Sequence, residues 1–439
     1  MYFLMFFADT VVICSRWVDL FREQCRQSVD GKWSKPLNMT HEVNYLVFDI
    51  LGDLCFGKNF NMKEPDSDLK HIPELMAGFL QTLAPVSPRA PSHNTSRAPW
   101  EEKQIVHTHQ KKNTATNTHL SPSQVAWSPY ANLWVWLKPR GLDWLLQYAI
   151  PDSMIQWQKF VANNLAERTA AQEQVQKGLR PERCDFFHYL FDTKDPLTGA
   201  PGYDLNELFG ECEILTIAGS DTTAITMAAM MFYLAHSPRI QDKLAREIAA
   251  TFSDSAEIKG GAELHGCKYM RAFVYETLRM APPVPADLAR EVRAGGTTVE
   301  GDFFPPGTQL STSPYCLNYN SDIYRDPFVF RPERWLTKSE DPEGSEEAEV
   351  ALAESGHCAF STGSRGCVGK NMAWLEMQIV LAKLVFALEI RPDANARGAC
   401  TGAGGPDLAQ GRREVGQFQL YDAFVAMRDG PMVQFRERA

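Results

Sequence analysis

One cysteine of this chain lies in a stretch whose residue types suit a metal thiolate. The stretch FSTGSRGCVGK runs from Phe360 to Lys370 and surrounds Cys367 with glycines. Glycine loses more backbone freedom on folding than any other residue, so such a run indicates a backbone that must turn closely around something. A cysteine sulfur binds metal as the thiolate. The apolar spacing that follows predicts a helix beginning at Cys367, whose free N–H groups and dipole would stabilise the anion.

The spacing within this stretch is Phe-x-x-Gly-x-Arg-x-Cys-x-Gly, formed by Phe360, Gly363, Arg365, Cys367 and Gly369. The alternative is a glycine-rich loop that holds an ordinary buried thiol. The number of matching positions and the helix after them favour the metal site. The remaining cysteines are scattered without a Cys-x-x-Cys pair, which indicates reduced thiols and argues against a zinc site.

The second candidate site is a short run of polar residues that interrupts a long apolar segment. DLNE at Asp204 resembles a capping box, and the helix that it opens is predicted to continue to Ser237-Pro238. AGSDTT, from Ala218 to Thr223, lies inside this helix. Glycine costs about 1 kcal/mol relative to alanine in a helix interior, and an unpaired buried carboxylate costs more. These residues therefore need a functional reason, the alternative being a local kink with a self-bonded threonine.

Two further elements complete an ordered set of motifs. ETLR places Glu276 and Arg279 on one helix face, and FRPERW follows with Arg334. Alone, Glu-x-x-Arg is usually a solvated helix pair. In this order, with the cysteine stretch last, the chain resembles the cytochrome P450 family, the haem-thiolate monooxygenases, of the fungal membrane-associated kind. The resemblance runs from about residue 15 to the end, except for 86–124.

The resemblance implies a mainly α fold with a small β-sheet portion, in a single domain, 1–439, around haem b. It makes Cys367 the axial iron ligand. It places haem-binding roles on Phe360, Gly363, Arg365, Gly369, Arg290, Ala218 and Gly219. For Arg290, which would bind a propionate, a surface arginine at a strand start is the alternative.

Other roles also come from the resemblance. Gly219 would let the long helix open and admit dioxygen, and Asp221 and Thr222 would relay protons. Glu276, Arg279 and Arg334 would form a buried charged network, which is tolerable only if each partner satisfies the others. The substrate pocket would be lined by Val284, Pro285 and Ala286.

The implied reaction inserts one oxygen atom of O2 into an apolar small molecule of secondary or xenobiotic metabolism. Electrons would come from NADPH through a separate cytochrome P450 reductase, and the enzyme would be a monomer. One alternative is a haem-thiolate isomerase or dehydratase that needs no reductase; the Asp-Thr pair argues against it. The other is an inactive, truncated gene product that binds no haem.

Composition supports a globular protein and sets limits on its partners. The net charge of -10 without a basic cluster argues against a nucleic-acid binder. Full-length relatives would lie on the cytosolic face of the endoplasmic reticulum membrane. The apolar start MYFLMFFADTVVIC is too short to span a bilayer, so we expect no anchor in this chain. Arg16 and Trp17 do not match the family's Trp-x-x-x-Arg spacing, which implies N-terminal truncation.

Three segments give further expectations. Residues 86–124 have no hydrophobic period, so we interpret them as a disordered insertion or a retained intron. Residues 287–330 alternate β-branched and aromatic residues with Gly and Pro, which predicts short strands and turns. The C-terminal sequence predicts a hairpin that turns at Asp429-Gly430.

Overall fold

The structure is a computed structural model that describes residues 8–28, 33–83, 136–142, 145, 151–179, 183–406, 408 and 412–438. The segment 86–124 lies outside these residues. The fold is mainly α with small antiparallel sheets, as predicted. The main helices are α2 (Ala8–Arg26), α3 (Met39–Phe56), α4 (Ile72–Leu83), α7 (Asp152–Gln176), α8 (Phe186–Asp192), α9 (Leu205–His236), α10 (Pro238–Thr251), α11 (Ala262–Gly266), α12 (Lys268–Met280), α13 (Pro314–Asn318), α14 (Glu347–Gly356) and α15 (Lys370–Ala387).

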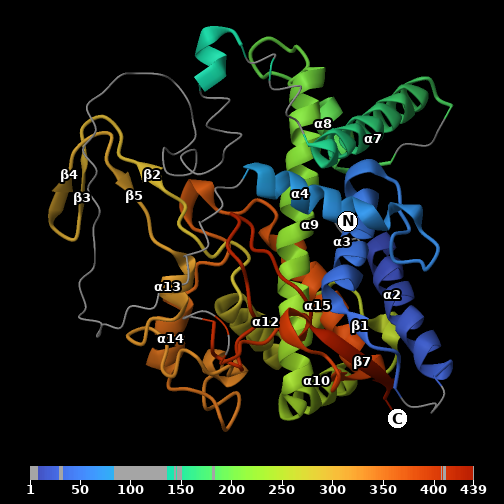
Figure 1. Ribbon diagram of the computed structural model, residues 1–439, viewed down its shortest axis with the longest axis vertical. Coiled ribbons are helices and arrows are strands. Elements are labelled where there is room, and N and C mark those ends of the chain that lie inside the picture. Colours follow the sequence, from blue (N-terminus) through green and yellow to red (C-terminus); the bar gives the residue numbers. More distant parts are fainter. Residues whose placement is uncertain are drawn as a thin grey trace.

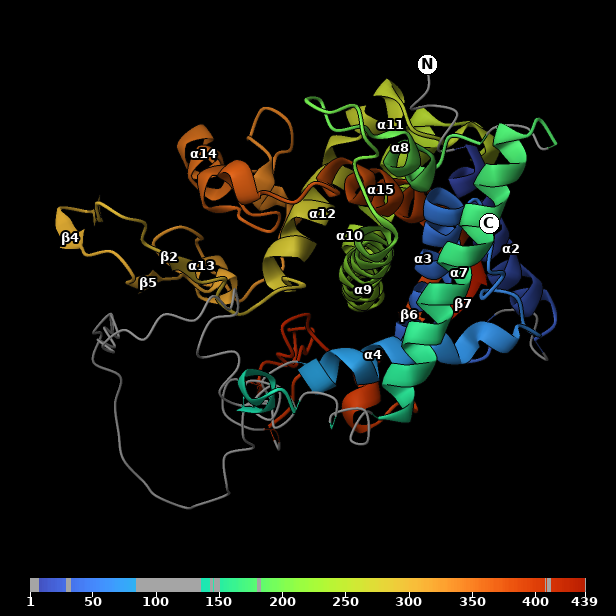
Figure 2. The same cartoon turned by 90° about the horizontal axis from the view of Figure 1, so that it is seen from above.

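Helix α9 runs through the middle of the molecule (Figures 1 and 2). The predicted capping box is confirmed: the Asp204 side chain accepts from the Glu207 N–H, and the Glu207 side chain accepts from the Asp204 N–H. The helix has 32 residues, and it is long and apolar enough to cross a membrane. Because 61% of its apolar 18-residue stretch is buried inside the protein, α9 is the central core helix.

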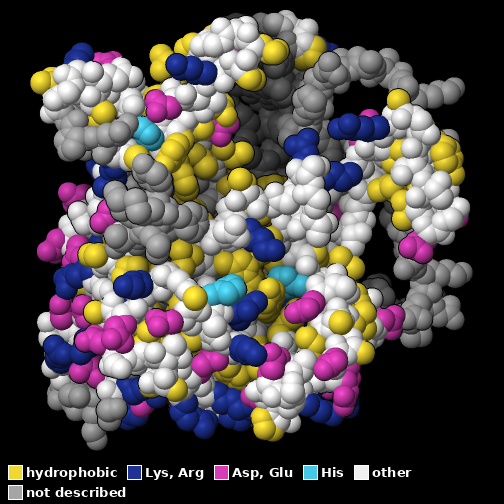
Figure 3. Space-filling view, turned by 180° about the vertical axis from the view of Figure 1, so that it is seen from behind, with side chains coloured by type: hydrophobic (Ala, Val, Ile, Leu, Met, Phe, Trp, Pro, Cys, Tyr) yellow, Lys and Arg dark blue, Asp and Glu magenta, His cyan; other side chains and the backbone are white. Residues whose placement is uncertain are grey.

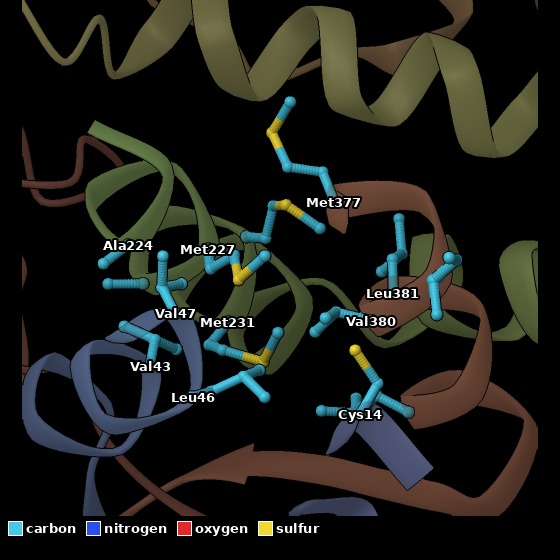
Figure 4. Close-up of a cluster of buried hydrophobic side chains, with 14 of the residues drawn as sticks. Cys14, Val43, Leu46, Val47, Ala224, Met227, Met231, Met377, Val380 and Leu381 are labelled. Carbon is cyan, nitrogen blue, oxygen red and sulfur yellow. The ribbon is translucent and has the colours of Figure 1, made fainter. Parts of the chain in front are cut away.

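The core forms where α3 and α15 pack against the second half of α9, and α2 packs in turn on α3 and α15. Figure 4 shows Val43 and Val47 of α3 beside Ala224 and Met227 of α9, with Met377 of α15 on another side. All of these side chains are buried. Helices α4, α7 and α8 lie around the other end of α9 (Figure 1). The motif AGSDTT thus lies at the border between the dense core and the open end of the helix.

In the described part of the chain, the strands form one three-stranded sheet and two two-stranded antiparallel pairs. The first sheet has the order β1-β7-β6, all antiparallel, with Ile390 opposite Phe435. The other pairs lie within 287–330, which confirms the strands expected there. The strands are β1 (Leu37–Asn38), β2 (Arg290–Glu291), β3 (Thr297–Val299), β4 (Asp302–Phe304), β5 (Gln309–Leu310), β6 (Leu388–Pro392) and β7 (Met432–Glu437), and the 3₁₀ turns are η1 (Asp68–His71), η2 (Lys138–Arg140), η4 (Ser255–Glu257), η5 (Pro332–Trp335), η6 (Gly363–Arg365) and η7 (Gly398–Thr401).

Two sequence predictions about boundaries are wrong. The helix after the cysteine begins at Lys370 with Gly369 as its cap, because the intervening residues form a turn. The C-terminal hairpin does not turn at Asp429-Gly430. The chain reverses earlier, between Tyr421 and Met427, which form an antiparallel bridge. It then continues through Asp429 and Gly430 into β7. Gly430 has φ +76° and lies so close to the Cys400 carbonyl that a Cβ would clash, which explains the glycine.

Candidate active site

The cysteine stretch holds its thiol at the surface. The Cys367 N–H donates to the Phe360 carbonyl at 2.8 Å, and the Gly366 N–H donates to the Gly363 carbonyl at 3.0 Å. Gly363 has φ +69°, a conformation that favours glycine. Cys367 is exposed, and the next residue, Val368, is 100% exposed. The backbone therefore presents a thiol and an apolar side chain together, next to the start of α15.

The neighbouring residues leave space for a flat group. Arg365 and Gly363 are exposed, and a Cβ on Gly363 would meet no atom within 4 Å. A Cβ on Gly369 would lie 3.9 Å from the Cys367 Sγ. Phe360 is half-buried, and its ring centroid lies 6.4 Å from that of Trp374 on α15. Phe360 thus joins the thiol loop to the core.

Behind this loop, the structure brings together Glu276, Arg279 and Arg334, all of which are buried. Arg279 donates to both Glu276 oxygens, Nε to Oε2 at 2.9 Å and Nη2 to Oε1 at 2.8 Å. The Arg334 Nε lies 3.4 Å from the Glu276 Oε1. Trp335, which sequence reasoning missed although it ends the motif FRPERW, donates from Nε1 to the Glu276 Oε2 at 2.9 Å.

This network keeps Glu276 ionised despite complete burial. Burial alone would raise its pKa, but the charges and hydrogen bonds of Arg279, followed by the charge of Arg334, outweigh burial and lower the pKa. The remaining guanidinium donors of Arg279 reach the carbonyls of Asn318 at 2.7 Å and Pro327 at 2.8 Å. The network thereby fastens α12 to the segments that precede the thiol loop.

On α9, one face of the AGSDTT region is not packed. Ile214 is 59% exposed, Ala218 is exposed and Thr222 is half-buried, at helical spacings of four. The Thr222 Oγ1 donates to the Ala218 carbonyl at 2.8 Å. A hydroxyl with its proton held in this way keeps lone pairs that can accept a further hydrogen bond. The stripe is therefore an open apolar surface with one hydroxyl.

Two other residues of this motif, Gly219 and Asp221, face elsewhere. A Cβ on Gly219 would lie 2.8 Å from the Leu51 Cδ2 of α3, so the glycine allows α3 and α9 to approach closely. This contact is sufficient to explain why the residue is glycine. The proposed role of Gly219 in admitting dioxygen stays a prediction. Asp221 accepts from the Arg428 Nη1 at 3.1 Å. Sequence reasoning missed Arg428, whose only signal is a single cation in the apolar run DAFVAMRDG.

The remaining predicted residues lie on the segment after α12. Arg290 is exposed at the start of β2, and its Nη1 donates to the carbonyls of Leu288 at 2.9 Å and Ala289 at 3.1 Å. Its propionate role stays a prediction. The predicted pocket residues Val284, Pro285 and Ala286 are half-buried. The C-terminal segment is fixed beside them, because the Ala426 N–H donates to the Pro283 carbonyl at 2.8 Å.

The donor chemistry fits a haem iron. Within the part of the chain that the structure describes, no group of three or more His, Cys, Asp or Glu side chains could hold a metal ion. Cys367 can therefore supply a single ligand to a metal whose other ligands come with a cofactor. Its exposed thiol, the open space at Gly363 and the apolar Val368 suit a large flat cofactor. The cationic Arg365 suits its carboxylates.

Comparisons with known proteins agree with this chemistry. The cytochrome P450 family model matches residues 136–397. A cytochrome P450 monooxygenase of Gibberella zeae is 29% identical over 95% of this chain and 83% of its own length. The cytochrome P450 monooxygenase lcsN of Purpureocillium lilacinum is 32% identical over 69% of this chain and 84% of its own length. AKT7 of Alternaria alternata is 37% identical over 58% of this chain, which spans 48% of AKT7.

The fold agrees as well. A cytochrome P450 crystal structure superimposes with a TM-score of 0.63, covering 99% of this chain and 74% of the other at 16% identity. The family match, the related sequences and the shared fold lead to one conclusion: this chain belongs to the cytochrome P450 family, whose cofactor is haem.

Proposed function

We propose that the chain is a monooxygenase that binds haem b through the Cys367 thiolate. The observation that carries the proposal is the exposed Cys367 thiol, held by the 2.8 Å bond from its own N–H to the Phe360 carbonyl at the start of α15. Phe360, Gly363, Arg365 and Gly369 would surround the haem, and Arg290 would bind a propionate. Thiolate-ligated haem supplies dioxygen binding and O–O cleavage.

The protein's own part is to hold the cofactor and to move protons. Asp221 would take a proton from solvent, and the Thr222 Oγ1 would accept a hydrogen bond and pass a proton along the open face of α9 at Ala218. Overall, one oxygen atom enters a C–H bond. The two electrons of NADPH, with two protons, reduce the other oxygen atom to water.

An apolar substrate suits the residues near this face. Val284, Pro285 and Ala286 carry no charge, and the Ala426 bond to Pro283 places the C-terminal segment beside them. Val425 and Ala426 pack on Ile225 of α9. We propose a small secondary metabolite or xenobiotic, hydroxylated where it lies between α9 and these segments.

Electron delivery is proposed to occur beside the thiol loop. A groove of about 770 Å³ at the start of α15 is lined by Trp374 and Leu375, with Lys370, Arg271 and Lys259 also in its lining. Lys370 follows Cys367 by three residues. A basic, partly apolar surface this close to the thiolate suits an acidic NADPH-cytochrome P450 reductase. On the face in Figure 3, basic and acidic side chains are intermixed.

We propose that the enzyme acts as a monomer and that its full-length relatives lie at the cytosolic face of the endoplasmic reticulum membrane, where such a reductase would meet them. The test is the carbon monoxide difference spectrum of the reduced, haem-loaded chain. The expected result is a thiolate-type Soret band, lost in Cys367→Ala and kept in Cys358→Ala. A band that survives Cys367→Ala would overturn the assignment.

The same sample separates the alternatives. A thiolate band with turnover that does not depend on NADPH and reductase would indicate an isomerase or dehydratase. Absence of haem binding in the wild-type chain would indicate an inactive product.

A further inference from the structure

The groove beside α15 contains a polar side chain that the proposed electron delivery does not use. Gln378 belongs to the groove lining and is 4% exposed, and its Nε2 has no hydrogen-bond partner among the described residues. A buried amide without a partner is costly. The groove volume of about 770 Å³ lies in the range of small-molecule sites. The unpaired amide and the space beside it therefore indicate a site for a ligand.

Three residues of the lining form one row along α15. Lys370, Trp374 and Gln378 follow one another at spacings of four, so their side chains lie on one face of the helix. At roughly 1.5 Å per residue the row is about 12 Å long. Lys370 is exposed, Trp374 is half-buried and Gln378 is buried. A ligand that lies along the row would meet a cation at the mouth, an aromatic ring in the middle and an amide at the inner end.

Two other segments contribute walls to the groove. Helix α12 packs beside α15 (Figure 2), and its Tyr275 ring centroid lies 4.7 Å from that of Trp374. The segment 256–265 contributes Gly260, where a Cβ would lie 3.0 Å from the Leu375 Cδ1. The glycine thus allows this segment to approach α15 closely. The middle of the groove is therefore apolar.

The charge of the lining is positive. Its described residues include Lys259, Arg271 and Lys370 and no carboxylate, although the whole chain has a net charge of -10. Glu263 of α11 is exposed and lies outside the lining. The Lys370 Nζ lies 5.9 Å from the Phe360 ring centroid, and within the described part of the chain none of the three cations forms an ion pair. Unpaired cations around an apolar groove suit an anionic ligand.

We propose that this groove binds an elongated apolar carboxylate with a hydroxyl at its far end, a long-chain hydroxy acid. The carboxylate lies at Lys370, where the other two cations add attraction. The alkyl chain lies on Trp374 and Leu375. The hydroxyl pairs with Gln378, because an amide offers one donor and one acceptor group and a hydroxyl can serve both.

An occupied groove would also slow electron delivery, and this consequence rests on the proposed function. Lys370 and Trp374 belong to the surface at which the reductase is proposed to dock. The bound acid would neutralise part of the positive charge and cover the apolar part of that surface. Addition of the hydroxy acid should therefore lower the rate of reduction by reductase.

Calorimetric titration of the haem-loaded chain tests the site. The probes are dodecanoate, 12-hydroxydodecanoate and dodecane-1,12-diol, each below its micelle concentration. The hydroxy acid should bind more tightly than dodecanoate by a factor of about five, the value of one net hydrogen bond. It should also bind more tightly than the diol, which lacks the charge. Equal affinities of the two acids would overturn the proposal.

Two variants test the two ends of the row. Gln378→Met should lose the preference for the hydroxy acid and bind dodecanoate at least as tightly as wild type. Lys370→Gln should weaken both acids several-fold and leave the diol unaffected. Lys177→Gln, directly after the end of α7 and outside the groove, is the matched control and should bind all probes like wild type. A hydroxyl preference that survives Gln378→Met would overturn the site, as would acid binding that shifts the Soret band and ignores both variants.

Other occupants of the groove give different results. If residues 1–7 filled it, both acids would bind only after deletion of residues 2–7. If a second copy filled it, sedimentation velocity would show a concentration-dependent dimer that the acids do not dissociate. Either result would overturn the ligand site.

The two proposals can fail separately. A chain without a thiolate band refutes the monooxygenase, while titration of the haem-free chain and its variants still decides whether the groove binds the hydroxy acid. Binding that depends on both Lys370 and Gln378, without any change in the reduction rate, refutes the effect on electron delivery alone.

Discussion

Gly219 of α9 and Leu51 of α3 lie so close together that a Cβ on the glycine would be 2.8 Å from the Leu51 Cδ2. Because Gly219 has no side chain, the backbone of α9 can pack directly against the Leu51 side chain of α3, just before the dense core begins. The contact also fixes the rotation of α9, and with it the face on which Ala218 and Thr222 are open.

Gly219→Ala should therefore destabilise the chain. The helix gains about 1 kcal/mol from alanine, but overpacking costs about 1–3 kcal/mol, so we expect a net loss of about 1 kcal/mol. Gly210→Ala, in the same helix with no atom within 4 Å of its Cβ, is the control and should stabilise by about 1 kcal/mol. Denaturant unfolding measures both. If the two variants behaved alike, the Leu51 contact would not explain the glycine.

The buried carboxylate of Glu276 should make Arg279 indispensable to stability. Arg279→Met removes the bidentate pair, so that Arg334 at 3.4 Å is the remaining cation at Glu276, beside the neutral donors Trp335 Nε1 and the Arg331 N–H. Loss of one partner of a buried pair costs about 3–5 kcal/mol. The control is Arg325→Met, an exposed arginine 4.0 Å from Glu349, which should change the unfolding free energy by less than about 0.5 kcal/mol. Comparable losses in both variants would contradict the central role of the Glu276 network.

Sequence reasoning succeeded where a local pattern has a local cause. The Asp204 capping box, the length of α9 and the strands after Asp287 follow from neighbours within a few residues, and the structure has all of them. It failed at the start of α15 and at Asp429-Gly430, because a turn and a close contact with Cys400 decide those positions. The Arg428 bond to Asp221 spans 207 residues, and no periodicity could reveal it.

Glu376 of α15 should make stability depend on pH. Burial raises its pKa to about 8 from an ordinary 4.5, and neither carboxylate oxygen has a hydrogen-bond partner among the described residues. Burial is the main cause that raises the pKa of the Cys14 thiol on α2; the charge of Glu376 raises it further, and Lys383 acts in the opposite direction. The folded chain therefore keeps the Glu376 proton to about pH 8, whereas the unfolded chain loses it near pH 4.5.

The sign follows from this difference. Between about pH 4.5 and 8 the folded state binds more protons than the unfolded state, so the Glu376 contribution to stability falls as pH rises and levels off above pH 8. Glu376→Gln should remove this slope and be more stable than wild type at pH 8 by on the order of 3–5 kcal/mol. Exposed Glu354→Gln is the control and should follow wild type. Urea unfolding across this pH range measures it, and parallel curves for wild type and Glu376→Gln would show that the carboxyl does not titrate in this window.

The basic lining of the groove beside α15 should control electron delivery. Arg271 and Lys370 both line the groove, and exposed Lys370 follows Cys367 by three residues. Reversing either charge removes attraction to an acidic reductase and slows association, so Lys370→Glu and Arg271→Glu should lower the reduction rate several-fold at low salt. The difference in reduction rate between each variant and wild type should become smaller as ionic strength rises. Stopped-flow formation of the carbonyl complex measures the rate. Lys177→Glu, directly after the end of α7 and outside the groove, should be reduced at the wild-type rate. If this variant were reduced as slowly as Lys370→Glu, net charge rather than this surface would govern the encounter.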